Sequence, residues 1–315
     1  MTVTGPLQLP APVQLWFDEA LLAVPTPFYI HRYPAMWKSI PARSGTKIRM
    51  RRYNRLPSAT VPLGPNSLTP PPVVLTAVDI DATMQFYGQW IALNEQIVLQ
   101  NQDPVLNEAA ARLGESLRQT EDEITRNVLA STASIINCVN GTNGDNPTNS
   151  STTDVFDVVT ALRNADGYPI QGAIEGEDRF GTGPVRDCYI VMANTALIND
   201  LNNLSGWLPK WQYPAADTSL TSEEGALGQT RWLLSTLGSV SENASALGAD
   251  VYNCFAVAKE GYAIVNQDDY RPSFLYRDPM YSGPLSLYGT VGWKTAMVAR
   301  ITQDTWVNNL RCTLS

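Results

Sequence analysis

The chain has 315 residues, 44% of them hydrophobic, which is enough to build the core of one large domain or two smaller ones. Its formal charge of −8 and pI near 4.7 argue against a protein that mainly grips phosphates. The sequence shows neither a secretion signal nor an apolar run of about 18 residues, so we expect a soluble chain with no membrane partner. The four cysteines lie far apart, which predicts buried, reduced thiols rather than a zinc site or a disulfide scaffold.

Residues 1–40 are rich in proline and aromatic side chains, and only residues 15–24 could form a short helix. This composition predicts an extended N-terminal arm. Its aromatic residues need a surface to bury against, in the same subunit or in another one. The ones we predict at such a contact are Trp16, Phe17, Phe28 and Tyr29.

Residues 41–86 carry most of an unusual cluster of positive charge. No acidic residue lies between Glu19 and Asp79, and eight cations fall in that stretch, whereas from Asp79 onward there are 28 acidic and 14 basic residues. Alternation over 46–54 and 73–86 predicts two strands joined by a proline-rich tip at 57–72, with Lys47, Arg49 and Arg51 on one face. An isolated two-stranded ribbon is only marginally stable in water, so we expect this extended loop to pack against another protein surface.

Three partners are open for the cations of the ribbon: acidic surfaces of a neighbouring copy, DNA, or solvent. The first fits best, because the acidic bulk of the chain would repel DNA. The predicted contact residues are Lys47, Arg49, Arg51, Arg52 and Arg55.

Residues 104–137 form the clearest predicted element, a helix about 50 Å long at the usual rise per residue, which we expect to act as a spine. A polar loop at 138–153 and a mixed α/β region at 154–260 follow, and in the latter we predict a short helix over 154–165, a strand near 188–192 and a helix near 194–204. Alternating residues at 291–301, and again at 306–312, predict strands that return to the spine helix. We therefore predict one domain from 87–153 and 261–315, and a second from 154–260.

The sequence offers little material for catalysis. His31 is the single histidine, and we interpret it as a packing or hydrogen-bonding residue because no metal site or catalytic triad can be built around it. Phosphate-binding and dinucleotide-binding glycine motifs are missing from the sequence, and the paired carboxylates are better explained as solvated or ion-paired groups. We therefore expect no enzymatic activity, no cofactor and no metal.

Five strings in a fixed order resemble a known family. They are Ile48-Arg49-Met50-Arg51-Arg52-Tyr53, Gln85-Phe86-Tyr87-Gly88, Glu224-Gly225-Ala226-Leu227-Gly228, Asp278-Pro279 and Gly292-Trp293-Lys294. Together they are similar to the major capsid proteins of tailed bacteriophages with the Hong Kong 97-type fold, in the branch typified by the coat protein of the short-tailed coliphage N-four. The resemblance spans about residues 15–312.

The resemblance implies an α+β fold with an N-terminal arm, an extended β-hairpin loop, a peripheral domain on the spine helix, and an apical domain. It implies a structural subunit that self-assembles into pentamers and hexamers of an icosahedral head around double-stranded DNA. Implied partners are other copies, a portal protein, a separate scaffolding protein, a cement or decoration protein, and DNA by weak non-specific contact. The virion is the expected location, with assembly in the bacterial cytoplasm. Alternatives are a nanocompartment shell, a decoration protein, or an enzyme of unrecognised type.

Overall fold

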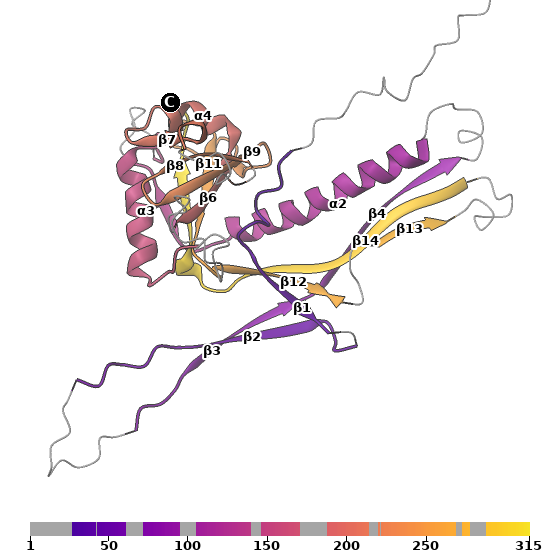
Figure 1. The fold of residues 1–315 in the computed structure, drawn as a ribbon, viewed down its shortest axis with the longest axis horizontal. Coiled ribbons are helices and arrows are strands. Elements are labelled where there is room, and N and C mark those ends of the chain that lie inside the picture. Colours follow the sequence, from indigo (N-terminus) through magenta and orange to yellow (C-terminus); the bar gives the residue numbers. More distant parts are fainter. Residues whose placement is uncertain are drawn as a thin grey trace, which may run out of the picture.

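The computed structural model describes residues 27–41, 43–60, 72–94, 105–139, 146–170, 188–213, 220, 222–268, 273–277 and 288–315. Within these residues the chain forms a five-stranded sheet, an eight-stranded sheet and a separate two-stranded ribbon, together with helices that cover the sheets (Figure 1).

The five-stranded sheet is built around β14, its longest strand. Along one edge, β14 pairs antiparallel with β13 through its first half and with β12 through its last residues. Its other edge pairs antiparallel with β4. Strand β1 pairs parallel with β12 at the edge of the sheet. The strands are β1 (Met36–Ile40), β4 (Gln85–Asn94), β12 (Tyr262–Gln267), β13 (Ser273–Arg277) and β14 (Tyr288–Ile301). The strand predicted over 291–301 is thus confirmed.

Helix α2 (Val105–Ala130) runs along one face of this sheet (Figure 1). Every fourth residue from Ala109 to Leu129 is buried, because a spacing of four keeps side chains on one side of a helix. Leu113 and Leu117 pack against Val291 and Trp293 of β14. The amphipathic spine predicted from the sequence is confirmed over these residues.

The predicted end of the spine helix at residue 137 is wrong, since α2 ends at Ala130 and residues Ile135–Asn137 form strand β5. The Thr132 side chain donates a hydrogen bond to the Val307 carbonyl (2.9 Å), and the next residues pair parallel with β15 (Val307–Cys312). Ile135 continues the helical spacing in sequence, but backbone pairing with a distant strand overrides that local pattern.

The eight-stranded sheet has the order β5, β15, β11, β6, β9, β8, β7, with β10 attached to β11. Its remaining strands are β6 (Tyr189–Asn194), β7 (Trp207–Pro209), β8 (Glu223–Leu227), β9 (Thr230–Ser235), β10 (Val240–Ser241) and β11 (Val251–Val257). Of these, the sequence predicted only β6, near residues 188–192. Strands from β7 to β11 lie in the region 154–260, which we interpreted only as mixed α/β, because short buried strands lack a clear alternation.

Strand β15 joins a different sheet from the other strands of residues 261–315. It pairs antiparallel with β11 along six residues and so belongs to the eight-stranded sheet, whereas β12, β13 and β14 belong to the five-stranded one. Similarly, β1 lies within the predicted arm of residues 1–40 but forms the edge of the five-stranded sheet. Both strands are placed by partners at least 50 residues away, which local sequence does not reveal.

Two hydrophobic clusters cover the two faces of the eight-stranded sheet. Tyr189 and Val191 of β6 face helix α3 (Thr152–Asn164) and helix α4 (Ile198–Asn202), whereas Ile190 and Met192 face Ile30 and the end of α2. A capping box at Ser151 begins α3, in agreement with the predicted helix. Among the described residues, the short 3-10 helices are η2 (Thr195–Leu197), η3 (Lys210–Gln212) and η7 (Asp304–Trp306).

The four cysteines are buried thiols, as predicted. In the part of the chain that the structure describes, none of the helices combines the length and hydropathy needed to cross a membrane.

Candidate inter-subunit interface

Strands β2 (Lys47–Tyr53) and β3 (Ala77–Thr83) form an antiparallel ribbon that points away from both sheets (Figure 1). The predicted ribbon and its faces are confirmed, because Lys47, Arg49 and Arg51 are exposed while Ile48 and Met50 are half-buried. At its base, Ile48 packs with Ala296 and Val298 of β14. These residues alternate with Met297 and Ala299, which face α2, so the ribbon and the spine helix lie on opposite faces of the five-stranded sheet.

The exposed face of the ribbon carries its own acidic partners. The Arg49 guanidinium donates to both carboxylate oxygens of Asp81 (2.7 and 2.9 Å), and Arg51 does the same to Asp79 (2.7 and 3.0 Å). Hydrogen bonds from these guanidinium groups lower the pKa of both carboxyls. The antiparallel register sets this pairing by placing Arg49 opposite Asp81 and Arg51 opposite Asp79.

The sequence reasoning assigned Arg49 and Arg51 to acids of a neighbouring copy, and the structure shows that they already have partners within the ribbon. Lys47 is exposed beside Asp81, and its charge helps to lower the pKa of that carboxyl. Arg52 donates to the Gln303 side chain and thereby ties the ribbon to the body. Arg55 makes a long, exposed ion pair with Asp166 (3.4 Å), of a kind that contributes little.

Beyond β2 and β3 the ribbon becomes apolar. A backbone hydrogen bond from Asn54 to Thr76 (2.9 Å) continues the pairing of the two arms. From the last residue of β2 up to β3, the exposed large apolar side chains of the described residues are Tyr53 (59% exposed), Leu56 (51%), Val73 (59%), Val74 (77%) and Leu75 (56%). No charged residue occurs from residue 56 to residue 78. We define the exposed side chains of residues 53, 56 and 73–75 as the apolar tip.

Sequence reasoning missed the apolar tip. Alternation placed Val74 on the same side of the strand as Met84, but it did not show that Met84 is buried while Val74 is exposed. The available signal was the uncharged stretch itself, in which three consecutive apolar residues, Val73, Val74 and Leu75, end a ribbon too thin to bury them.

The N-terminal segment is fixed to the spine helix by a buried polar staple. The His31 backbone N–H donates to Asp122 Oδ1 (2.8 Å), and its ring Nδ1 lies 2.7 Å from Oδ2 of the same carboxyl, with both residues fully buried. Arg32 forms an ion pair with Glu121 (2.7 Å). Burial raises the pKa of the Glu121 carboxyl, and the Arg32 charge opposes this. The hydrogen-bonding role predicted for His31 is confirmed.

The predicted aromatic contacts of the arm divide into two pairs. Phe28 exposes 55% of its surface, while its carbonyl accepts a hydrogen bond from Ser235. The Tyr29 hydroxyl donates to the Glu115 carbonyl of α2 (3.4 Å). Trp16 and Phe17 lie outside the described residues.

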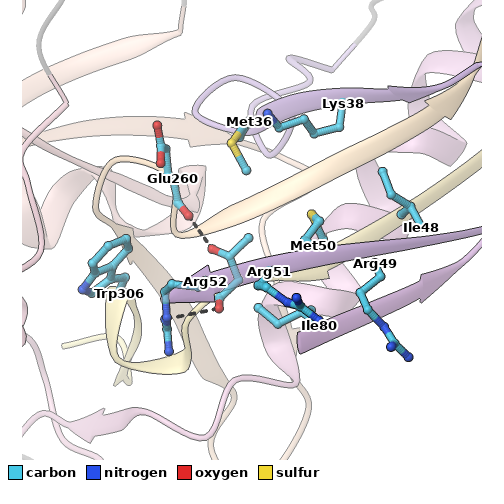
Figure 2. Close-up of a pocket in the computed structure, with 11 residues that line it drawn as sticks. Met36, Lys38, Ile48, Arg49, Met50, Arg51, Arg52, Ile80, Glu260 and Trp306 are labelled. Carbon is cyan, nitrogen blue, oxygen red and sulfur yellow. Dashed lines mark hydrogen bonds between the residues drawn. The ribbon is translucent and has the colours of Figure 1, made fainter. Parts of the chain in front are cut away.

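A groove of about 500 Å³ runs between the ribbon base and the body (Figure 2). Its apolar side chains are Met36, Ile48, Met50, Ile80 and Trp306, all of them half-buried. At one end, Arg52 donates to the Thr302 carbonyl (3.5 Å), and the Thr302 hydroxyl donates to the carbonyl of Glu260. An open apolar groove beside a projecting ribbon is suited to binding a polypeptide rather than to transforming a small molecule.

Comparisons with known proteins identify the class to which this surface belongs. The sequence profile of the family described as "Phage capsid protein" matches residues 77–275, which is more than half of the chain. The chain belongs to the phage capsid protein family. Among curated protein sequences, no match to this capsid protein was found.

Solved structures show the fold of this capsid protein at low sequence identity. The capsid of Ralstonia phage GP4 superposes with a TM-score of 0.74 at 12% identity, covering 100% of this chain and 98% of that one. The head of Helicobacter pylori bacteriophage KHP40 gives 0.67 at 11% identity, with 100% and 98% covered. The Cyanophage Pam1 capsid gives 0.62 at 11% identity, with 99% and 98% covered.

These findings confirm the predicted α+β fold of the Hong Kong 97 type and the predicted identity as a major capsid protein of a tailed phage. The family and the fold are those of structural capsid proteins, not of enzymes. Membership of the family also means that copies of this capsid protein assemble into multimeric capsomers and that the protein is located in the capsid of the virion.

Proposed function

We propose that this capsid protein self-assembles into the pentamers and hexamers of an icosahedral head that encloses double-stranded DNA. In this assembly the ribbon of each subunit lies on a neighbouring subunit. The observation that carries the proposal is the apolar tip, which ends a two-stranded ribbon that points away from its own body (Figure 1). A partner that buries it gains about 1.5–3 kcal/mol for each large apolar side chain fully removed from water.

We propose different roles for the charged and the apolar residues of the ribbon. Arg49 and Arg51 stiffen it by pairing with Asp81 and Asp79, and the uncharged tip supplies the apolar area. Lys47, Arg52 and Arg55 remain proposed contacts with the acidic remainder of a neighbour. On this view charge sets the approach and register of the ribbon, and apolar burial supplies most of the affinity.

The N-terminal arm supplies a second proposed contact between subunits. Phe28 exposes more than half of its surface although its backbone is held in place, as expected for a residue that a neighbour covers. Trp16 and Phe17 are proposed contacts on composition alone, and Tyr29 is proposed to support the arm where it leaves α2. We retain residues 154–260 as the core of the proposed apical domain, to which β15 adds a strand.

The remaining partners follow from what a closed head requires. DNA must enter at one vertex, which calls for a portal protein. A single subunit type must take both five-fold and six-fold positions, for which we propose a separate scaffolding protein. A cement protein and weak, non-specific contacts to DNA are further proposals, the latter because the net charge of −8 disfavours tight binding. Assembly is proposed to take place in the bacterial cytoplasm.

The test is a double substitution in the apolar tip, Val74→Asp with Leu75→Asp, in the full chain. Both side chains are exposed, so the subunit should fold with its stability changed by no more than about 0.5 kcal/mol per site. We expect wild-type protein to form capsomers, tubes or shells in negative-stain micrographs, and the variant to stay as small species in size-exclusion chromatography.

Leu247→Asp is the matched control, because Leu247 is 70% exposed on a loop before β11, far from the ribbon in sequence. This variant should assemble like the wild type. Normal particles from the tip variant would contradict the docking role of the ribbon. Shells of uniform size from the wild-type chain expressed alone would count against the scaffolding protein.

A further inference from the structure

Three of the four cysteines meet at one point in the core of the eight-stranded sheet. Cys138, Cys254 and Cys312 are all buried in the hydrophobic cluster that this sheet forms with helix α3. The sulfurs of Cys254 and Cys312 lie 4.0 Å apart, and the Cys312 thiol also lies in hydrogen-bonding contact with that of Cys138. Cys312 is therefore the middle one of three thiols that come from segments far apart in the chain.

The register of the strands favours one pair among these three cysteines. Strands β5 and β15 pair parallel up to Asn137 and Arg311, which places Cys138 opposite Cys312 at the next position. Adjacent strands lie about 4.7–4.9 Å apart, within the range of about 4.4–6.8 Å between Cα atoms that a disulfide joins. Cys254 of β11 is offset from Cys312 by two residues along the antiparallel register. Such diagonal Cα atoms are about 7–8 Å apart, so a disulfide fits Cys138 with Cys312 better.

The backbone holds Cys138 in this position at the edge of the sheet. Its N–H donates to the Arg311 carbonyl (2.9 Å), and its carbonyl accepts hydrogen bonds from the Thr148 backbone (2.8 Å) and hydroxyl (3.0 Å). Strand β5 has three residues and lies at one end of the strand order, and the next residue, Val139, is 67% exposed. Local opening of so short an edge strand exposes both thiols without unfolding the rest of the sheet.

We propose that Cys138 and Cys312 form a disulfide within one subunit when the capsid passes from the reducing interior of the cell to an oxidising medium. The oxidant is a small-molecule disulfide of the oxidised glutathione class. One cysteine thiolate attacks this oxidant and displaces a small thiol, and the other cysteine thiolate then displaces the second one. The two cysteine sulfurs are oxidised, the two sulfurs of the small molecule are reduced, and the protons of the cysteines end on the two small thiols.

This inference rests on the proposed assembly in the bacterial cytoplasm, because a chain assembled there starts with reduced thiols. It goes beyond that function by assigning a covalent change to the capsid after its release. The bond would join the segment that follows the spine helix to the last strand of the chain. It would thereby close a loop that contains residues 154–260, the core of the proposed apical domain.

The surroundings of the thiols make this oxidation slow in the folded subunit. The hydrogen bond to Cys312, together with burial, raises the pKa of the Cys138 thiol. A protonated thiol is a poor nucleophile, so the reaction proceeds mainly through molecules in which β5 has opened. We therefore expect the disulfide to form faster in dilute urea, below the concentration that unfolds the subunit.

The experiment counts free thiols in the full chain before and after native incubation with oxidised glutathione. Reduced protein, once denatured, should bind four equivalents of N-ethylmaleimide, because all four cysteines are free. After incubation it should bind two, and mass spectrometry should find the peptides of Cys138 and Cys312 joined. Four equivalents after incubation would overturn the proposal, and so would a bond that joins Cys254 or that holds only glutathione.

Thermal unfolding of unassembled subunits measures the effect of the bond. A cross-link that closes a long loop restricts the unfolded chain, so oxidation should raise the melting temperature by about 5–10 °C. The rise should disappear in Cys138→Ala, which keeps three free thiols. Cys188→Ala is the matched control, because Cys188 is buried outside the cluster, and it should form the disulfide like the wild type. Loss of the disulfide in that control would contradict the assigned pair, and the thiol count of the wild type holds whether or not Cys138→Ala folds.

Micrographs of the same samples test the proposed assembly separately. Particles that keep four free thiols after incubation would refute the disulfide and leave the assembly role intact. Subunits that form the disulfide but never form particles would refute the assembly role and leave the pairing of Cys138 with Cys312 intact.

Discussion

Replacing Asp122 with alanine removes the acceptor that holds the N-terminal segment on the spine helix. Its carboxylate accepts the His31 backbone N–H at 2.8 Å and contacts the ring Nδ1 at 2.7 Å, and both residues are fully buried. The variant leaves two buried polar groups without a partner, at about 1–3 kcal/mol each. We therefore expect the free energy of unfolding to fall by about 2–6 kcal/mol.

The assay is urea denaturation of unassembled subunits, followed by fluorescence of the eight tryptophans. Asp122→Asn keeps an oxygen acceptor for the backbone N–H and should lose less stability than the alanine variant. Asp157→Ala removes an exposed carboxylate from α3 and should change stability by no more than about 0.5 kcal/mol. A loss below about 1 kcal/mol for Asp122→Ala would refute the reasoning, since it would mean that water or a shifted side chain replaces the carboxylate.

Two further predictions concern the ribbon and the eight-stranded sheet. The pKa of Asp79 lies below its usual value near 3.8, because Arg51 donates hydrogen bonds to its charged form. The ion pair between Arg51 and Asp79 should therefore be intact above pH 3.8 and be lost only as the pH falls through the lowered pKa of Asp79. An NMR titration of the Asp79 carboxyl measures this pKa. The Arg51→Gln variant should return it toward 3.8, and a wild-type pKa at or above 3.8 would contradict the prediction. In the eight-stranded sheet, Gly225→Ala should lower the free energy of unfolding, measured by urea denaturation, by about 1–3 kcal/mol, since the added Cβ would lie 2.5 Å from the Trp207 ring. An unchanged denaturation midpoint would show that the ring can move aside.

The ribbon shows how far sequence reasoning reached at the candidate interface. Alternation of long cations with Ile48 and Met50 fixed both the strand and its two faces, because side chains on a strand alternate with a period of two. The partners of Arg49 and Arg51 could not be derived in the same way. They depend on the register between two strands separated by a long tip, and a shift of one residue would have placed Asp79 and Asp81 elsewhere.

The groove was beyond reach of sequence reasoning for a similar reason. Met36 and Met50 come from two strands and Trp306 from a 3-10 helix 270 residues after Met36, and only the packing of the ribbon against the sheet brings them together (Figure 2). The apolar tip, by contrast, was visible in the sequence as an uncharged stretch. Alternation shows which side chains share a face but not whether that face is buried, and the described end of the ribbon points away from its own body (Figure 1).

The resemblance to phage capsid proteins indicated the class of fold. The sequence by itself determined the spine helix over most of its length, the strand at 291–301 and the position of the projecting ribbon, since these depend on local periodicity and on the placement of charge and proline. Tertiary structure alone decided where α2 ends, which sheet β15 joins, which carboxylates pair with Arg49 and Arg51, and that a groove lies between the ribbon base and the body. Those outcomes depend on contacts between residues far apart in the chain, whose free energy outweighs local propensity and leaves no periodic trace in the sequence.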